Sequence, residues 1–170
     1  MKRLLTPKLI FGLVMVGLLA SALAVSLFLG SPARSHAASN NSPEGSWLLN
    51  VTITSDHPPF KFQALMTYDA GGGLVVTDQT DFNPQGLTSP GHGAWVSTGE
   101  DHFATTWIAF FFDAQGNPAG MVKVREVDTL SADGNTFSGS ATFNAFDANG
   151  KPVLSGTTIE HGKRIKVEGV

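Results

Sequence analysis

The sequence predicts an all-β domain, an eight-stranded antiparallel up-and-down β-barrel, preceded by an N-terminal signal or anchor helix. Three observations predict the barrel domain. After residue 45, apolar and polar residues alternate with a period of two, which is typical of strands that bury one face. Residues that favour turns interrupt this alternation repeatedly. No stretch after residue 45 has a helical repeat of useful length, so one β-domain is expected over 45–170.

The first 37 residues have the order of a secretory signal. A basic start without acids precedes an uncharged run of 22 residues, Leu9 to Gly30, and a small, polar segment follows. Ser35-His36-Ala37 fits the small-x-small rule, so cleavage is expected after Ala37. The uncharged run is also long enough to cross a bilayer, and an uncleaved signal anchor is the alternative. In either case the domain is expected to be secreted or to lie on the outer face of the cytoplasmic membrane.

Residues 38–44 have the small, polar composition of a linker. Beyond residue 37 the chain has seven basic and 14 acidic residues, a formal net charge of −7. An acidic surface without basic clusters argues against nucleic acid as a partner, and against membrane contact other than through an uncleaved N-terminal segment. The chain has no cysteine, which excludes both a disulfide-stapled domain and a lipidated cysteine anchor.

The strands are expected in one continuous series with short connections. Turn chemistry is expected at 70–73, 113–117, 133–135 and 149–150, and longer loops at 55–59 and 82–92. The predicted strands are 46–54, 60–69, 73–81, 93–99, 102–113, 119–131, 136–147 and 152–166.

Short connections favour an up-and-down meander over a Greek key. An open meander would leave two long edge strands, and pairing the last strand with the first removes both. A two-sheet sandwich is the alternative. An outer-membrane barrel is less favoured, because the chain has a single tyrosine for the expected aromatic girdles.

The ends of the predicted barrel resemble those of calycins, the superfamily that includes lipocalins. The residues that carry the resemblance are Gly45-Ser46-Trp47 at the first strand and Gly162-Lys163-Arg164 near the end of the last strand. The resemblance implies a structural pair in which Trp47 packs beneath Arg164. The segment 89–95 (SPGHGAW) is similar to one in small exported bacterial proteins labelled lipocalin-like, whose function is not established. Full lipocalins also have a C-terminal helix and a disulfide, which this chain lacks.

An eight-stranded barrel either fills its interior with side chains or holds one small ligand there. The main expectation is therefore a small apolar or amphipathic ligand bound inside. One alternative is a structural or interaction domain with a packed interior, and another is a barrel isomerase similar to allene oxide cyclase. The residues expected to form the ligand wall are Phe62, Tyr68, Trp95, Trp107, Phe137 and Phe143.

Three polar residues are candidates for chemistry inside the barrel. His92 lies between two glycines in a predicted loop, where it lines the barrel mouth or else bonds the loop carbonyls. Asp78 and Glu126 share the parity of apolar neighbours and are expected to point inward, unless a β-bulge returns them to solvent. The histidines form no ligand pair and no catalytic motif is present, so neither a metal nor a cofactor is expected.

The segment 107–112 (WIAFFF) is apolar on both faces. One face fills the interior, and the other is expected to be covered. The two hypotheses are a homodimer contact through 107–112 and coverage by residues 38–45.

Overall fold

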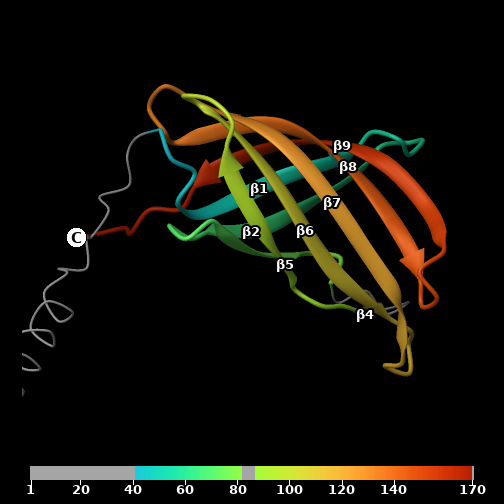
Figure 1. Ribbon diagram of the computed structural model, residues 1–170. Helices are drawn as coiled ribbons and strands as arrows, with labels where there is room; N and C mark the ends of the chain where they lie inside the picture. The colour runs from blue at the N-terminus through green and yellow to red at the C-terminus, as the bar shows by residue number, and fades with distance from the viewer. Residues whose placement is uncertain (1–40, 82–86, 170) are drawn as a thin grey trace, which may run out of the picture. The chain divides into compact units, whose positions relative to one another are not determined.

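The computed structural model describes residues 41–81 and 87–169, which form a β-barrel (Figure 1). The predicted signal or anchor segment, 1–37, lies outside these residues. Within the described part of the chain, no helix has the length and apolar character needed to cross a membrane. The strands are β1 (Gly45–Ile53), β2 (Phe60–Tyr68), β3 (Gly73–Asp78), β4 (Leu87–Thr88), β5 (Gly91–Ser97), β6 (His102–Phe112), β7 (Pro118–Leu130), β8 (Thr136–Asp147) and β9 (Pro152–Arg164).

The barrel is closed, and every pairing in it is antiparallel. β1 pairs with both β2 and β9, and β6 pairs with both β5 and β7, so the ring has no free end. Eight strands form the ring in chain order, while the two-residue β4 pairs with β6 beyond the end of β5. The predicted eight-stranded up-and-down barrel is confirmed, and the sandwich alternative is wrong.

The alternating sequence pattern produces one inward face on each strand. On β7, Val124, Glu126, Asp128 and Leu130 are buried and the residues between them are exposed. Apolar residues at every second position provide the core, because successive side chains of a strand point to opposite faces. Glu126 and Asp128 depart from the pattern, since they are acids on the buried face.

One half of the interior is filled with aromatic side chains, and we call it the packed end. Phe137 contacts Trp47 edge-on with ring centroids 4.9 Å apart, and it contacts Phe103 at 5.5 Å. Phe103 in turn meets Tyr68 at 5.5 Å. These rings are almost completely buried, and together they close this end of the barrel.

Arg164 closes the packed end from outside. Its guanidinium carbon lies 4.2 Å from the centroid of the Trp47 ring. It donates hydrogen bonds to the carbonyl oxygens of Ser42, Glu44 and Gly134, and the Trp47 indole N–H donates to the carbonyl of Pro43 at 2.7 Å. Residues 41–44, the described part of the predicted linker, are therefore held against the barrel.

β5 begins at Gly91, two residues earlier than predicted, and this changes the position of His92. In the strand, His92 points outward and is exposed, while Gly91 and Gly93 face inward. A Cβ at either glycine would lie within 2.7 Å of Trp107 side-chain atoms. The expectation that His92 lines the barrel mouth is therefore wrong. The two glycines make room for the Trp107 side chain.

The apolar segment 107–112 alternates between the two faces of β6. Trp107, Ala109 and Phe111 face the interior, and Phe110 on the outer face is 57% exposed. β4 pairs with the end of this segment, at Phe111 and Phe112. The described residues of 38–45 lie at the packed end against Arg164, so they do not provide the predicted cover for this outer face.

Candidate functional site

A cavity of about 200 Å³ occupies the half of the barrel opposite the packed end. Its walls are mostly apolar, and it is partly open to solvent. Glu126 and Glu160 lie on its inner side, toward the packed end. Asp78, the last residue of β3, and Thr80, in the loop that follows, also line the cavity. The apolar lining includes Leu49, Val51, Ile53, Phe62, Ala64, Met66, Val76, Trp107, Phe111, Val122, Val124 and Phe143.

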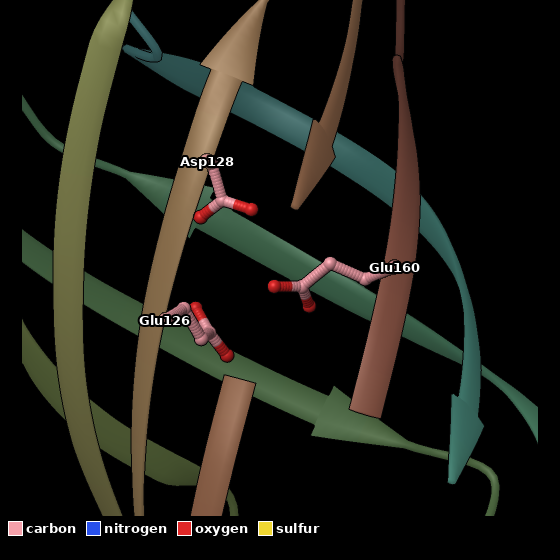
Figure 2. A group of neighbouring side chains, drawn as sticks. All are labelled: Glu126, Asp128 and Glu160. Carbon is pink, nitrogen blue, oxygen red and sulfur yellow. The ribbon is translucent and has the colours of Figure 1, made fainter. Parts of the chain in front are cut away.

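Three buried acids, Glu126, Asp128 and Glu160, form a cluster between the cavity and the packed end. Glu126 and Asp128 project from β7 and Glu160 from β9, and their carboxyl groups converge (Figure 2). One oxygen from each lies within 4.8 Å of one from the others. Each residue is at most 3% exposed, so the three groups meet in a region shielded from water. We call these residues the acidic cluster.

Small residues of β8 allow the acids of its neighbours to meet. Asp128 of β7 and Glu160 of β9 are both register partners of Gly139. A Cβ at Gly139 would clash with Asp128 Oδ1 and lie 2.5 Å from the Val127 carbonyl oxygen. The neighbouring inward position on β8 is Ala141, the partner of Glu126. The Asp128 carboxyl group therefore occupies the space that a larger side chain of β8 would fill.

Replacing Gly139 by alanine is expected to destabilise the barrel by about 1–3 kcal/mol, because the added methyl group meets fixed backbone as well as the Asp128 side chain. Urea unfolding of the full chain measures the change. Gly99→Ala is the control, since a Cβ there meets only the exposed His102 side chain, at 3.3 Å. Equal unfolding midpoints for the two variants would contradict the close approach at Gly139.

The acidic cluster contains hydrogen-bonding atoms without partners. Trp107 Nε1 donates to Glu126 Oε1 at 2.6 Å. Glu126 Oε2, both oxygens of Asp128 and Glu160 Oε1 accept no hydrogen bond from any described residue. Unsatisfied buried polar atoms are uncommon in folded proteins, because each loses its hydration without compensation. Their concentration beside a cavity marks the acidic cluster as a site that can receive donors.

Two hydroxyl groups extend this set of free polar atoms. Tyr68 and Thr105 are 2% and 3% exposed, and neither Tyr68 Oη nor Thr105 Oγ1 has a hydrogen-bond partner in the described residues. Thr105 is the register partner of Glu126. Burial first, and then the charges of all three clustered acids, raise the pKa of Tyr68, while the nearby Thr105 hydroxyl group lowers it. The Tyr68 hydroxyl therefore stays neutral next to the cluster.

Burial also dominates the protonation of the acids. It raises the pKa of Glu126 to about 8, with a further contribution from Asp128, although the Trp107 hydrogen bond lowers it. Burial raises the pKa of Asp128 to about 7, and the neighbouring Glu160 carboxyl group opposes this rise. The pKa of Glu160 is raised well above its ordinary value by burial and by the two other acids. At neutral pH the cluster therefore retains protons instead of carrying three negative charges.

Asp78 of β3 is the other acid that was predicted to point inward. It lies on the wall of the cavity, apart from the acidic cluster. Its Oδ1 accepts hydrogen bonds from the backbone N–H of Thr80 at 2.7 Å and from the Thr80 hydroxyl at 2.5 Å. Burial raises its pKa, while the bonds from Thr80 lower it. These local bonds fit a role in shaping the end of β3.

The predicted wall residues divide between the two halves of the barrel. Phe62, Trp107 and Phe143 line the cavity. Tyr68 and Phe137 belong to the packed end, where their rings contact Phe103. Trp95 is half-buried beside Tyr68, and its indole N–H donates to the carbonyl of Asp69 at 2.9 Å. Alternation places all of these residues on one face, but it does not give their height along the barrel axis.

The sequence pattern indicated Glu126 but neither Asp128 nor Glu160. Asp128 has the same parity as Glu126 on β7, so extending the alternation by one step would have found it. Glu160 has the parity of Gly162 and Arg164 on β9. Its approach to Asp128 depends on the registers of β8 with both neighbours, and alternation alone does not fix these registers.

The acidic cluster can bind a hydrogen-bond donor, an organic cation or a metal ion. Three carboxylates with oxygens this close are able to ligate a hard divalent cation. The protonated cluster can also donate a hydrogen bond or exchange a proton with a molecule in the cavity, because Glu126 and Glu160 reach the cavity surface. Comparison of the chain with protein-family models, curated proteins and solved structures found no match.

Proposed function

We propose that this protein is an exported, calycin-like barrel that binds one small amphipathic molecule in its interior. The observation that carries the proposal is the cavity of about 200 Å³, with apolar walls and with carboxyl groups at its inner side. Cavities of roughly 150 Å³ with apolar linings bind a molecule the size of benzene. The site therefore suits a single ring or a short chain that bears one polar group.

The ends of the barrel support the calycin-like assignment. Gly45-Ser46-Trp47 opens β1, and Arg164 lies over the Trp47 ring at the packed end. The closed ring of eight antiparallel strands is compatible with that superfamily. The basic start and uncharged run of the first 30 residues support export.

Benzyl alcohol and hexan-1-ol are suitable probes, because each has a small apolar body and one polar group. Titration into the full chain is expected to change the tryptophan emission, since Trp107 lines the cavity and donates to Glu126. Calorimetry on the same samples gives the stoichiometry, which is expected to be one. The proposal is wrong if neither tryptophan emission nor calorimetry responds to any probe of this size. The probes must include a ring compound, a chain compound and an amine.

Filling the cavity is expected to weaken this binding. Val122 of β7 lines the cavity, and Val122→Phe places a ring in the space of the ligand. The dissociation constant for benzyl alcohol is expected to rise about tenfold or more, which corresponds to roughly 1.4 kcal/mol. Val127→Phe is the matched control, because Val127 lies on the same strand, faces outward and is 61% exposed. Equal affinities of the two variants would place binding elsewhere.

A further inference from the structure

The ionisable groups around the cavity are all acids. Glu126, Glu160 and Asp78 line it, and no Lys, Arg or His does so among the residues that the structure describes. The basic residues of β7 near the acidic cluster, Lys123 and Arg125, have outward parity, and Arg125 is exposed. The cluster therefore has no internal countercharge.

We infer that the molecule bound in the cavity is an organic cation, a primary amine whose ammonium group lies among Glu126, Asp128 and Glu160. This inference rests on the proposed function and names the chemical class of the ligand. It accounts for the two halves of the site together, since the apolar walls would hold the hydrocarbon part while the acidic cluster holds the nitrogen.

The free acceptors of the cluster match the donors of an ammonium group. Such a group has three N–H donors and no acceptor. Glu126 has Oε2 free because Trp107 occupies only Oε1, and Asp128 and Glu160 supply the other free oxygens. Each carboxyl group therefore offers at least one acceptor, and hydrogen bonds between ionised partners are the stronger kind.

The hydroxyl groups of Tyr68 and Thr105 give a second, independent indication of a ligand. Both are almost completely buried next to the acids and lack partners in the described part of the barrel. Hydroxyl groups are able to donate to a carboxylate and so to hold its charge. The surroundings of the cluster can thus support an ionised carboxyl group once a cation arrives.

Binding of an amine also accounts for the protons that the cluster holds at neutral pH. If the amine enters as the free base, it takes a proton from a carboxyl group, and an ammonium–carboxylate pair forms with no net change. If it enters as the ammonium ion, a carboxyl group releases one proton to water. Because the three carboxyl groups are already desolvated by folding, the cation does not have to displace their hydration shell.

A divalent metal ion is the alternative occupant of three carboxylates. Magnesium and calcium ions keep waters or further oxygens in a coordination shell of six or more ligands. The cluster adjoins apolar residues on the side of the cavity, including Val51 and Phe143. Val51 and Phe143 suit the hydrocarbon part of an amine and supply no oxygen to a metal ion, while Thr158 adds one hydroxyl group to the lining.

Three molecules with the same phenyl ring test the inference. Benzylamine and benzyl alcohol differ only in the polar group, benzoate carries a carboxylate directly on the ring, and calorimetry with the full chain at neutral pH gives their affinities. Benzylamine is expected to bind about tenfold or more tightly than benzyl alcohol, and benzoate is expected not to bind. Repeating the benzylamine titration in two buffers of different ionisation enthalpy reports the proton released or taken up.

Removing one acid tests the position of the ammonium group. Glu160→Gln keeps the shape of the side chain and is expected to lower the preference for benzylamine over benzyl alcohol to about threefold or less. Glu126→Gln is expected to act in the same direction, which keeps the test available if one variant does not fold. Glu100→Gln, in the exposed turn after β5, is the matched control and should retain the full preference.

The outcomes separate the inference from the proposed function. Equal affinities for benzylamine and benzyl alcohol would overturn the amine inference and leave the binding proposal in place. No binding of any of the three, together with no binding of hexan-1-ol, would overturn both. A calorimetric response to calcium or manganese chloride that is lost in Glu160→Gln, with benzylamine silent, would assign the cluster to a metal ion and overturn the inference.

Discussion

The free energy of unfolding is expected to fall by several kcal/mol as the pH rises from about 4 to about 8. Glu126 and Asp128 have ordinary pKa values of 4.5 and 3.8, and burial raises them to about 8 and about 7 in the folded barrel. The folded state therefore binds more protons than the unfolded state throughout this interval. Urea unfolding at a series of pH values measures the loss.

Stability falls with rising pH because the pKa of each acid is raised in the folded state. Below the ordinary values both states are protonated, and the cluster contributes its full stability. Between the ordinary and the raised values only the folded state holds the protons, so each step upward in pH favours unfolding. Glu160 adds to the effect in the same direction, because its pKa is also raised.

Glu126→Gln provides the internal comparison for this prediction. The variant keeps a side chain that can accept from Trp107 but cannot ionise, so its stability is expected to depend less steeply on pH. Near pH 8 it is expected to be more stable than the parent chain. A parent chain with flat stability over the whole interval would show that the acids are hydrated in the folded state.

Trp47→Ala is expected to lower the free energy of unfolding by about 3–5 kcal/mol, the usual cost of truncating a buried tryptophan. Trp47 is completely buried. The change removes the edge contact with Phe137, the surface beneath Arg164 and the hydrogen bond to Pro43. Thermal or urea unfolding of the full chain provides the measurement.

Leu154→Ala is the control for the truncation, because Leu154 is 62% exposed on β9, and surface changes of this kind are usually within about 0.5 kcal/mol of neutral. A loss at Trp47 as small as the loss at Leu154 would show that the packed end contributes little to stability. In that case the stability of the barrel would depend on the residues around the cavity.

The strands and their closure could be predicted from the sequence, because each depends on a local signal. Alternation and turn residues located the strands of the ring, and the edge-strand argument predicted the pairing of β9 with β1. β5 was the exception. Gly91 and Gly93 flank His92 at the start of this strand, and these glycines suggested a loop. In the structure they allow Trp107 to pack against the strand.

The candidate site could be predicted only in part, because it depends on registers. Parity correctly indicated that Glu126 faces inward, and the structure buries it. The meeting of Asp128 with Glu160 needs Gly139 in register with both, and no single strand contains that information. The division of the aromatic residues between the packed end and the cavity likewise depends on the stagger of the strands.

The contacts of Arg164 bring the first and last described residues of the barrel together. The Arg164 side chain holds the backbone before β1. The backbone N–H of Ile165, the next residue along the chain, donates to the carbonyl oxygen of Ser46 in β1. The polypeptide thus enters and leaves the domain at a single pole. A segment that continues from residue 41 or from residue 169 would therefore start at that pole, and the cavity lies in the other half of the barrel.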